Sequence, residues 1–268
     1  MSVLLSERQG AVVRLTLNRP TAGNALDLEL ARALRESAKS LSADESCAVI
    51  VLQAEGPLFC GGGDVAEMSE AASAAEYVRE LAGTVHDALL TLAESDKVLI
   101  GAVQGPAAGG GVGIVTNCDY VVASEGASFV SAYSKVGLSP DCGASYLMPR
   151  IVGRARAAEF LLLGGGLDAE TAHRWGVVNA ISSADDIRSV AHQAAVRVAR
   201  MPTGARAATK RLLAAAWLPG YREHLENERD SIARLAGTEE SDRLRTAFLE
   251  RGGPSPSETR GAERGSAA

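Results

Sequence analysis

The chain contains 268 residues, of which 46% are hydrophobic, 22% are charged and only 4% are aromatic. This length suits one large domain, or one domain with a smaller appendage, and the composition is too apolar for a disordered chain. The net charge of −6 at pH 7 argues against non-specific nucleic-acid binding, which requires a basic surface.

The cysteines and histidines show no metal-binding pattern. No CxxC pair and no His-paired metal spacing occurs, so we expect reduced, mostly buried thiols and no bound metal. The histidines are scattered and suggest neither a zinc site nor a Ser-His-Asp triad. These residues are Cys47, Cys60, Cys118 and Cys142, with His86, His173, His192 and His224.

Neither a targeting segment nor a membrane span is predicted. Residues 1–10 include charges and lack the apolar run of a signal peptide. The most apolar stretch, residues 98–115, is interrupted by Gln104, Pro106 and several glycines, and does not reach the roughly 20 apolar residues of a span. We therefore expect a cytoplasmic protein without membrane contact.

The first half of the chain alternates strands, turns and helices. Residues 12–17 alternate in polarity and predict a strand, and residues 26–41 carry apolar side chains at helical spacing. The apolar run at 48–52 is typical of a strand buried on both faces. A glycine turn at 59–64 and a helix at about 74–93 follow.

The same alternation then repeats. A buried strand at 98–103 leads through a second glycine turn, 105–111, into an apolar helix at 112–117, and residues 120–123 predict another strand. This order indicates parallel pairing in a layered α/β fold. From about residue 184 to residue 250 the pattern is helical, and residues 252–268 have the composition of a disordered tail.

Each of the two glycine turns follows a buried strand, and the second opens a helix. Such a turn presents free backbone N–H groups to a ligand. Residues 109–113 lack the spacing of a dinucleotide-binding turn, and the Lys and Ser/Thr of a phosphate-binding loop are missing. Two turns whose N–H groups meet at one carbonyl oxygen would form an oxyanion hole; the alternative is that the glycines serve only close packing.

Several motifs together resemble the enoyl-CoA hydratase/isomerase (crotonase) family. Residues 18–26 resemble its "NRP…NAL" start, 59–64 its "F-x-A-G-x-D" turn, and 104–111 its "N-G-x-A-x-G-G-G" turn. Residues 118–120 and 137–150 also match, and the resemblance spans about residues 3–252.

The resemblance implies a spiral of repeated ββα units with a helical C-terminal oligomerisation region. It divides the chain into a core at 1–200, a trimerisation region at 201–251 and the tail at 252–268. It also implies an acyl-CoA substrate, a homotrimer or dimer of trimers, and no separate cofactor, since coenzyme A is part of the substrate. Gly63 and Gly110 would supply the two oxyanion N–H groups.

The chain departs from family hydratases at both catalytic glutamates. One glutamate position is Gly113 and the other is Tyr133, and both would instead belong to the substrate pocket. A tyrosine with a pKa near 10 is a poor base at neutral pH. Ordinary hydration is therefore a second reading, with Asp141 acting through water or Tyr133.

Asp141 remains as the candidate acid–base. Residues 129–150 resemble ring-epoxide isomerases of phenylacetyl-CoA breakdown, which also lack the hydratase glutamates. From spacing alone, Asp141 equally predicts an N-cap for a helix at 142–151; the resemblance favours catalysis. We expect an apolar pocket to raise the pKa of Asp141.

The resemblance also places coenzyme A. Phe248 would pack near adenine and Arg251 would meet a phosphate, although Phe248 is equally a plain core residue of a terminal helix. Gly61 and Ala66 are the other expected contact positions. The family often has a lysine at the position of Ala66, so one common contact with coenzyme A is missing. Asp64 is expected to be a structural turn or cap residue.

The sequence thus predicts an acyl-CoA isomerase that moves a double bond or rearranges a ring, with Asp141 as proton shuttle. Hydration is second, and thioester hydrolysis, decarboxylation or C–C cleavage on the same fold is third. A catalytically silent acyl-CoA-binding subunit is the alternative from another class.

Overall fold

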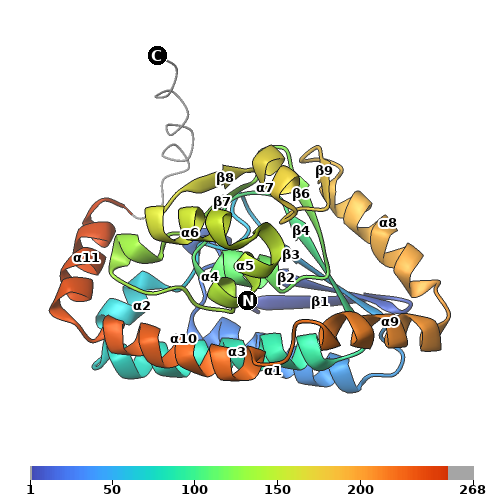
Figure 1. Ribbon diagram of the computed structural model, residues 1–268, viewed down its shortest axis with the longest axis horizontal. Helices are drawn as coiled ribbons and strands as arrows, with labels where there is room; N and C mark the ends of the chain where they lie inside the picture. Colours follow the sequence, from blue (N-terminus) through green and yellow to red (C-terminus); the bar gives the residue numbers. More distant parts are fainter. Residues whose placement is uncertain (1, 253–268) are drawn as a thin grey trace, which may run out of the picture.

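The computed structural model describes residues 2–252 and has two sheets surrounded by helices (Figure 1). The larger sheet has six strands in the order β1-β2-β3-β4-β6-β9. Its strands pair in parallel except for the β1–β2 hairpin. They are β1 (Leu4–Gln9), β2 (Val12–Leu17), β3 (Val49–Ala54), β4 (Val98–Val103), β6 (Tyr120–Ser124) and β9 (Ala180–Ser182).

The smaller sheet has three short strands in the order β5-β7-β8. These are β5 (Ala107–Ala108), β7 (Ser128–Val130) and β8 (Gly166–Asp168). The chain runs from β4 in the large sheet to β5 in the small sheet and then into a helix, and it repeats this path from β6 through β7. This repetition confirms the predicted spiral of ββα units.

Eleven α-helices and two short 3-10 helices complete the described chain. The 3-10 helices are η1 (Pro20–Ala22) and η2 (Tyr133–Val136). The α-helices are α1 (Leu28–Ala43), α2 (Val65–Glu70), α3 (Ala74–Glu94), α4 (Gly110–Thr116), α5 (Ala144–Val152), α6 (Arg154–Leu163), α7 (Ala169–Trp175), α8 (Ile187–Ala199), α9 (Thr203–Ala215), α10 (Tyr221–Ala236) and α11 (Glu239–Glu250).

The large sheet is covered on both faces, as the apolar run at 48–52 predicts. Along β3, Ile50 and Leu52 join the core formed with α1 and α3, whereas Val49 and Val51 join a second cluster with α8. All six residues of β3 are buried. Because successive strand residues point to opposite faces, a strand with helices on both sides must be apolar throughout.

The C-terminal half of the chain is largely helical, as expected. Helix α10 runs along α3 beside the spiral core, and α11 follows it (Figure 1). None of the helices in residues 2–252 has the length and apolar content needed to cross a bilayer. The predicted boundary near residue 200 remains a prediction, and the expected tail lies outside the described residues apart from Gly252.

Helix α4 begins two residues earlier than predicted, at Gly110. Gly109 adopts a φ of 49°, a left-handed conformation that glycine reaches without steric cost. The chain therefore turns sharply from β5 into the helix. Gly110 becomes the first helical residue, so its N–H has no partner within the helix.

Asn24 holds the segment that leads into the first glycine turn. Its amide donates to the carbonyl oxygens of Glu55 and Leu58, both at 2.8 Å, and its oxygen accepts the backbone N–H of Arg19 at 2.8 Å. Asn24 is fully buried and has a φ of 52°. The expected structural role of Asp64 is confirmed, because its carboxylate caps α2 and pairs with Arg19.

We predict that Asn24→Ala lowers the free energy of unfolding by at least about 2 kcal/mol, because buried carbonyl groups lose their donors. Asn24→Gly loses the same hydrogen bonds but tolerates the positive φ, so its loss should be smaller. Urea denaturation of both variants measures the difference. Equal stability of Asn24→Ala and the wild type would contradict this role.

Candidate active site

The two glycine turns lie against each other at the ends of β3 and β4. The N–H of Ala108 donates to the oxygen of Cys60 at 2.9 Å, and that of Phe59 donates to Pro106 at 3.0 Å. A Cβ atom on Gly62 would lie 2.9 Å from the oxygen of Ala108. This close approach explains why the turns carry glycine and shows that they form one unit.

Two N–H groups of this unit lack a protein acceptor. Within the described residues, neither Gly63 nor Gly110 donates its backbone N–H to another protein atom. Their neighbours are bonded: the N–H of Leu26 donates to Gly62, and the N–H of Asp64 donates to Leu26. Both glycines line the same pocket, so their N–H groups are available to a ligand there.

The pocket is apolar apart from the turns, and Asp141 is the one charged side chain among its lining residues in the described chain. Aliphatic side chains from α3 and Ile232 from α10 form much of its wall. Phe248 of α11 also reaches it. An acyl chain would therefore meet hydrocarbon surface and a single carboxylate.

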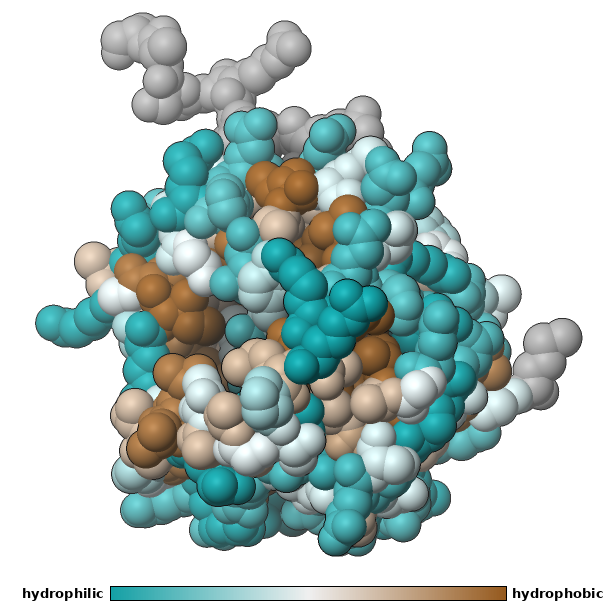
Figure 2. Space-filling view, turned by 90° about the vertical axis from the view of Figure 1, so that its right-hand side faces the viewer, coloured by the Kyte–Doolittle hydropathy of each residue, from teal (hydrophilic) through white to brown (hydrophobic). Residues whose placement is uncertain are grey.

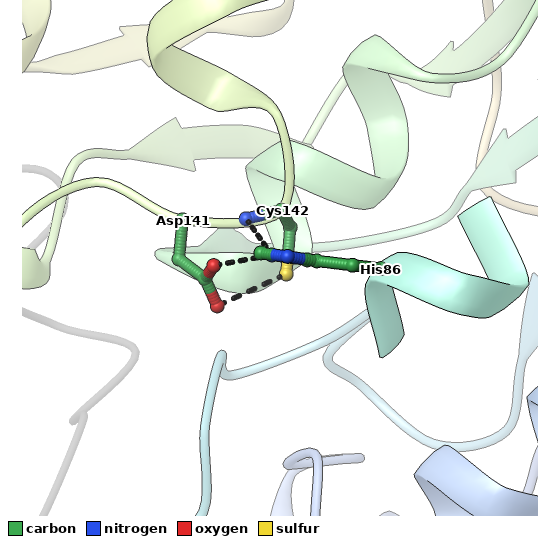
Figure 3. A group of neighbouring side chains, drawn as sticks. All are labelled: His86, Asp141 and Cys142. Carbon is green, nitrogen blue, oxygen red and sulfur yellow. Dashed lines mark hydrogen bonds and ion pairs between the residues drawn. The ribbon is translucent and has the colours of Figure 1, made fainter. Parts of the chain in front are cut away.

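Asp141 forms a buried pair with His86. Its Oδ1 lies 2.5 Å from Nε2 of His86, which projects from α3, and its Oδ2 accepts the Cys142 thiol at 3.5 Å (Figure 3). The backbone N–H of Cys142 points to the same Nε2 at 3.3 Å. Residues 55 positions apart thus meet beside the pocket.

The predicted rise in the pKa of Asp141 is wrong. Burial alone raises it, but the charge of His86 and hydrogen bonds from His86 and Cys142 outweigh burial and hold the pKa below its usual value. Burial lowers the pKa of His86, and the charge of Asp141 reverses this, so the net pKa is raised. The contact thus favours the carboxylate form of Asp141 and protonation of His86.

Asp141 is not a helix cap. Helix α5 begins at Ala144, and its N-cap residue is Gly143, which has no side chain that could cap the helix. The buried carboxylate of Glu228, on α10, instead accepts the N–H of Gly143 at 2.7 Å and that of Ser145 at 3.0 Å. This leaves the Asp141 carboxylate free to face the pocket and His86.

The two positions of the missing glutamates differ in their surroundings. Tyr133 lines the pocket, and its hydroxyl donates to the backbone oxygen of Asp141 at 3.0 Å. Burial raises the pKa of Tyr133 well above its usual value. Gly113 is not among the pocket-lining residues, contrary to the expectation. A Cβ atom there would lie 2.4 Å from Cβ of Cys142, so Gly113 packs behind the turn that carries Asp141.

The four expected coenzyme A residues separate into two groups. Gly61 and Phe248 line the pocket. Ala66 is exposed on α2, and Arg251 is exposed just beyond the end of α11. Their contacts with coenzyme A remain predictions.

Comparison with known proteins agrees with this geometry. The sequence profile of the family described as Enoyl-CoA hydratase/isomerase matches residues 7–258. The chain belongs to the enoyl-CoA hydratase/isomerase family.

Three relatives indicate how varied the chemistry of this family is. The chain is 35% identical to a 1,2-epoxyphenylacetyl-CoA isomerase from Escherichia coli, over 88% of this chain and 91% of the relative. It is 35% identical to 4-chlorobenzoyl coenzyme A dehalogenase-2 from Arthrobacter, over 74% and 72%. An enoyl-CoA hydratase structure from Mycobacterium avium subsp. paratuberculosis superposes with a TM-score of 0.84 at 30% identity, covering 92% and 98%.

The sequence predicts no metal site. In the structure, however, His86, Asp141 and Cys142 each place one atom of a metal-ligating type within 4.8 Å of the other two. These atoms already hydrogen-bond one another. Burial and the charge of Asp141 raise the pKa of the Cys142 thiol well above its usual value, whereas a metal-binding cysteine must be ionised. The donor set therefore suits a hydrogen-bonded cluster.

Sequence reasoning missed His86 and Glu228. Both lie on helices remote in sequence from Asp141, and the family motifs do not include them. One signal was present: His86 belongs to the buried face of α3, with Ala82 and Leu89 at helical spacing. A histidine on an apolar helix face requires a partner, but its identity depends on the fold.

The raised pKa of His86 predicts a pH-dependent contribution to stability. The contribution is complete below the unfolded pKa of about 6.5 and is lost as pH rises through the higher folded pKa. It is also lost at low pH, as pH falls through the lowered pKa of Asp141.

Urea denaturation should therefore show a larger deficit for His86→Gln at about pH 5.5 than at about pH 9. His192→Gln is the matched control, because His192 lies on α8, across the large sheet. A deficit for His86→Gln that grows with pH would contradict the assigned direction.

Proposed function

We propose that this enzyme isomerises an unsaturated acyl-CoA, moving a double bond or rearranging a ring, with Asp141 as the proton shuttle. One observation carries the proposal: among residues 2–252, Asp141 is the single carboxylate lining the pocket that contains Gly63 and Gly110. The glutamate positions of family hydratases are occupied by Gly113 and Tyr133. One carboxylate is enough for isomerisation, because the same group acts first as base and then as acid.

In this mechanism the thioester oxygen accepts the N–H groups of Gly63 and Gly110. Asp141 removes a proton from C2 of a 3-enoyl chain, and the electrons of the C–H bond move into the carbonyl to give a dienolate. Each oxyanion donor is worth about 3–4 kcal/mol in such a step. Asp141 then returns the proton at C4, and the double bond forms between C2 and C3.

The low pKa of Asp141 makes stabilisation of the enolate important. An ionised carboxylate is always ready to accept a proton, but it is a weak base. The oxyanion hole compensates by lowering the pKa of the substrate C–H bond. His86 fixes the orientation of the carboxylate through the 2.5 Å contact.

Hydration has weaker support. It needs a second acid–base group to activate water and protonate the α-carbon. The Tyr133 hydroxyl donates a hydrogen bond to a backbone oxygen and has a raised pKa. Besides Asp141, the described pocket wall has no carboxylate. Water addition to a 2-enoyl-CoA should therefore be slower than isomerisation.

Dehalogenation is a second candidate because an ionised carboxylate in an apolar pocket is also a nucleophile. The dehalogenase relative is named for a 4-chlorobenzoyl thioester. Asp141 would attack the carbon bearing chlorine, the electrons would move to the thioester oxygen in the oxyanion hole, and chloride would leave. Water would then hydrolyse the resulting aryl ester and release the 4-hydroxybenzoyl thioester.

We also propose that coenzyme A binds through Gly61, Phe248 and Arg251, and that the subunits form a homotrimer or dimer of trimers. Figure 2 shows several hydrophobic areas on the side that bears α8 and α9. Exposed leucines on α9 are Leu212 and Leu213, and those on α6 are Leu162 and Leu163. Contact between subunits would remove such side chains from water.

Asp141→Asn should reduce conversion of a 3-enoyl-CoA to the 2-enoyl isomer by at least about 10²-fold, because the proton shuttle is lost. Ultraviolet absorbance of the conjugated product measures the rate. Asp168→Asn is the control, since Asp168 caps α7 away from the pocket. Unchanged turnover in Asp141→Asn would exclude Asp141 as the shuttle.

A single turnover with 4-chlorobenzoyl-CoA in ¹⁸O-water separates the two candidates. If Asp141 is a nucleophile, the first product hydroxyl carries an unlabelled oxygen from the carboxylate, and chloride is released. For an isomerase we expect no chloride release above the Asp141→Asn background. Isomerase activity without dehalogenation would support the first candidate.

A further inference from the structure

His86 lies between two hollows of different character. Asp141, which it contacts, lines the apolar pocket, whereas His86 itself lines a separate groove between α3 and α10. His86 is not among the residues lining the pocket. The imidazole therefore forms part of the wall between the carboxylate and the groove.

The groove is polar and has room for water. Its volume is about 370 Å³, and one water molecule occupies about 30 Å³ of liquid. Thr84 and Gly83 of α3 contribute to its wall beside His86. Its charged lining residues are Arg79, Glu80 and Asp87 from α3, with Arg222, Glu226 and Arg229 from α10.

The two ring nitrogens of His86 have different surroundings. Nε2 faces Oδ1 of Asp141 and the N–H of Cys142. Nδ1 has no hydrogen-bond partner within the described residues, and this atom is not fully buried. It therefore keeps contact with solvent.

We propose that His86 is a proton port, meaning a side chain that passes protons between Asp141 and water in the α3–α10 groove while the substrate fills the pocket. The proposal rests on the proposed function, since it concerns the proton that Asp141 takes from the acyl chain. It adds a route by which that proton exchanges with solvent.

The exchange step starts from the neutral form of His86 with its hydrogen on Nδ1, the tautomer whose Nε2 can accept the N–H of Cys142. The Asp141 carboxyl donates the proton taken from the acyl carbon to the lone pair of Nε2, and Nδ1–H passes its proton to a groove water. One proton enters the ring and one leaves. In the return step Nδ1 takes a proton from groove water, and Nε2–H returns one to Asp141.

Other groups around Asp141 are poorly suited to this role. The Cys142 thiol has a pKa raised well above its usual value, and Tyr133 donates its hydroxyl to a backbone oxygen. The remaining pocket wall is mainly hydrocarbon. A bound acyl chain would thus leave His86 as the connection between Asp141 and solvent within the described chain.

Isomerisation in deuterium oxide tests the port through the origin of the proton at C4. Wild-type enzyme should place solvent deuterium at C4. The measured quantity is the deuterium ratio, meaning solvent deuterium divided by transferred substrate hydrogen at C4 of the product. In His86→Gln this ratio should fall at least about tenfold, since a positioned acid–base group contributes about 10²–10⁴-fold to proton transfer. This ratio compares the rate of exchange with the rate of proton return at C4, so a structural effect that only slows proton return would raise it rather than lower it. His192→Gln is the control.

A matched pair of variants tests the groove itself. A Cβ on Gly83 would have one neighbour within 4 Å, the Cδ of Arg229 at 3.5 Å. Gly83→Ala should fold and leave the groove open, whereas Gly83→Met should fold and fill it. Gly83→Met should lower the deuterium ratio and Gly83→Ala should not. Equal ratios in the two variants would overturn the proposal.

Hydrogen exchange at the imidazole C2–H of His86, measured by mass spectrometry, gives a readout without turnover. Saturating octanoyl-CoA should leave the His86 exchange rate within about twofold of the rate without ligand. Gly83→Met should slow this exchange at least about tenfold relative to Gly83→Ala. Suppression by octanoyl-CoA with no effect of Gly83→Met would show that solvent enters through the pocket and would overturn the port.

These measurements separate the two claims. Absence of isomerisation, with His86 exchange still controlled by Gly83→Met, would overturn the proposed function and keep the route to the groove. Isomerisation with an unchanged deuterium ratio in His86→Gln would overturn the port and keep the function.

Discussion

Backbone hydrogen bonds between residues 59–60 and 106–108 hold the two glycine turns together, and the site depends on this contact. The turns meet because β3 and β4 are parallel neighbours whose carboxyl ends lie at one edge of the sheet. A Cβ atom on Gly111 would lie 2.5 Å from the oxygen of Cys60, so side chains are excluded where the turns touch. The N–H groups of Gly63 and Gly110 are consequently fixed before any ligand arrives, and preorganised donors need no rearrangement during reaction.

Three titratable groups at and behind the pocket wall come from separate parts of the chain. Helix α3 supplies His86, α10 supplies Glu228, and the turn before α5 supplies Asp141. Burial and the charge of Asp141 raise the pKa of Glu228, while hydrogen bonds from Ser145 and Gly143 act in the opposite direction. Packing α10 against α3 thus brings His86 beside two buried carboxylates, which His86 and hydrogen bonds stabilise and which repel each other. The arrangement orients Asp141 and leaves its carboxylate at the wall of the apolar pocket.

Patterns within contiguous segments predicted most of the fold. Buried strands such as β3 follow from apolar runs, and the glycine clusters marked both turns and the residues whose N–H groups are free. Motif resemblance identified the family and singled out Asp141. The errors concern relations between distant segments: the helix after Asp141 is capped by Glu228, 87 positions further on in the sequence, and the pKa of Asp141 is lowered by His86. Gly113 was assigned to the pocket by position, but close packing against Cys142 places it behind the wall.

The vibrational frequency of a bound thioester carbonyl tests most directly whether Gly63 and Gly110 form an oxyanion hole. We would record isotope-edited infrared spectra of a carbonyl-¹³C-labelled enoyl-CoA bound to Asp141→Asn, in which turnover is blocked. Donation by the two N–H groups should polarise the C=O bond and move its stretch to lower wavenumber than in water. A stretch at the same or higher wavenumber than in water, with the ligand shown to be bound, would contradict the oxyanion hole and the mechanism built on it.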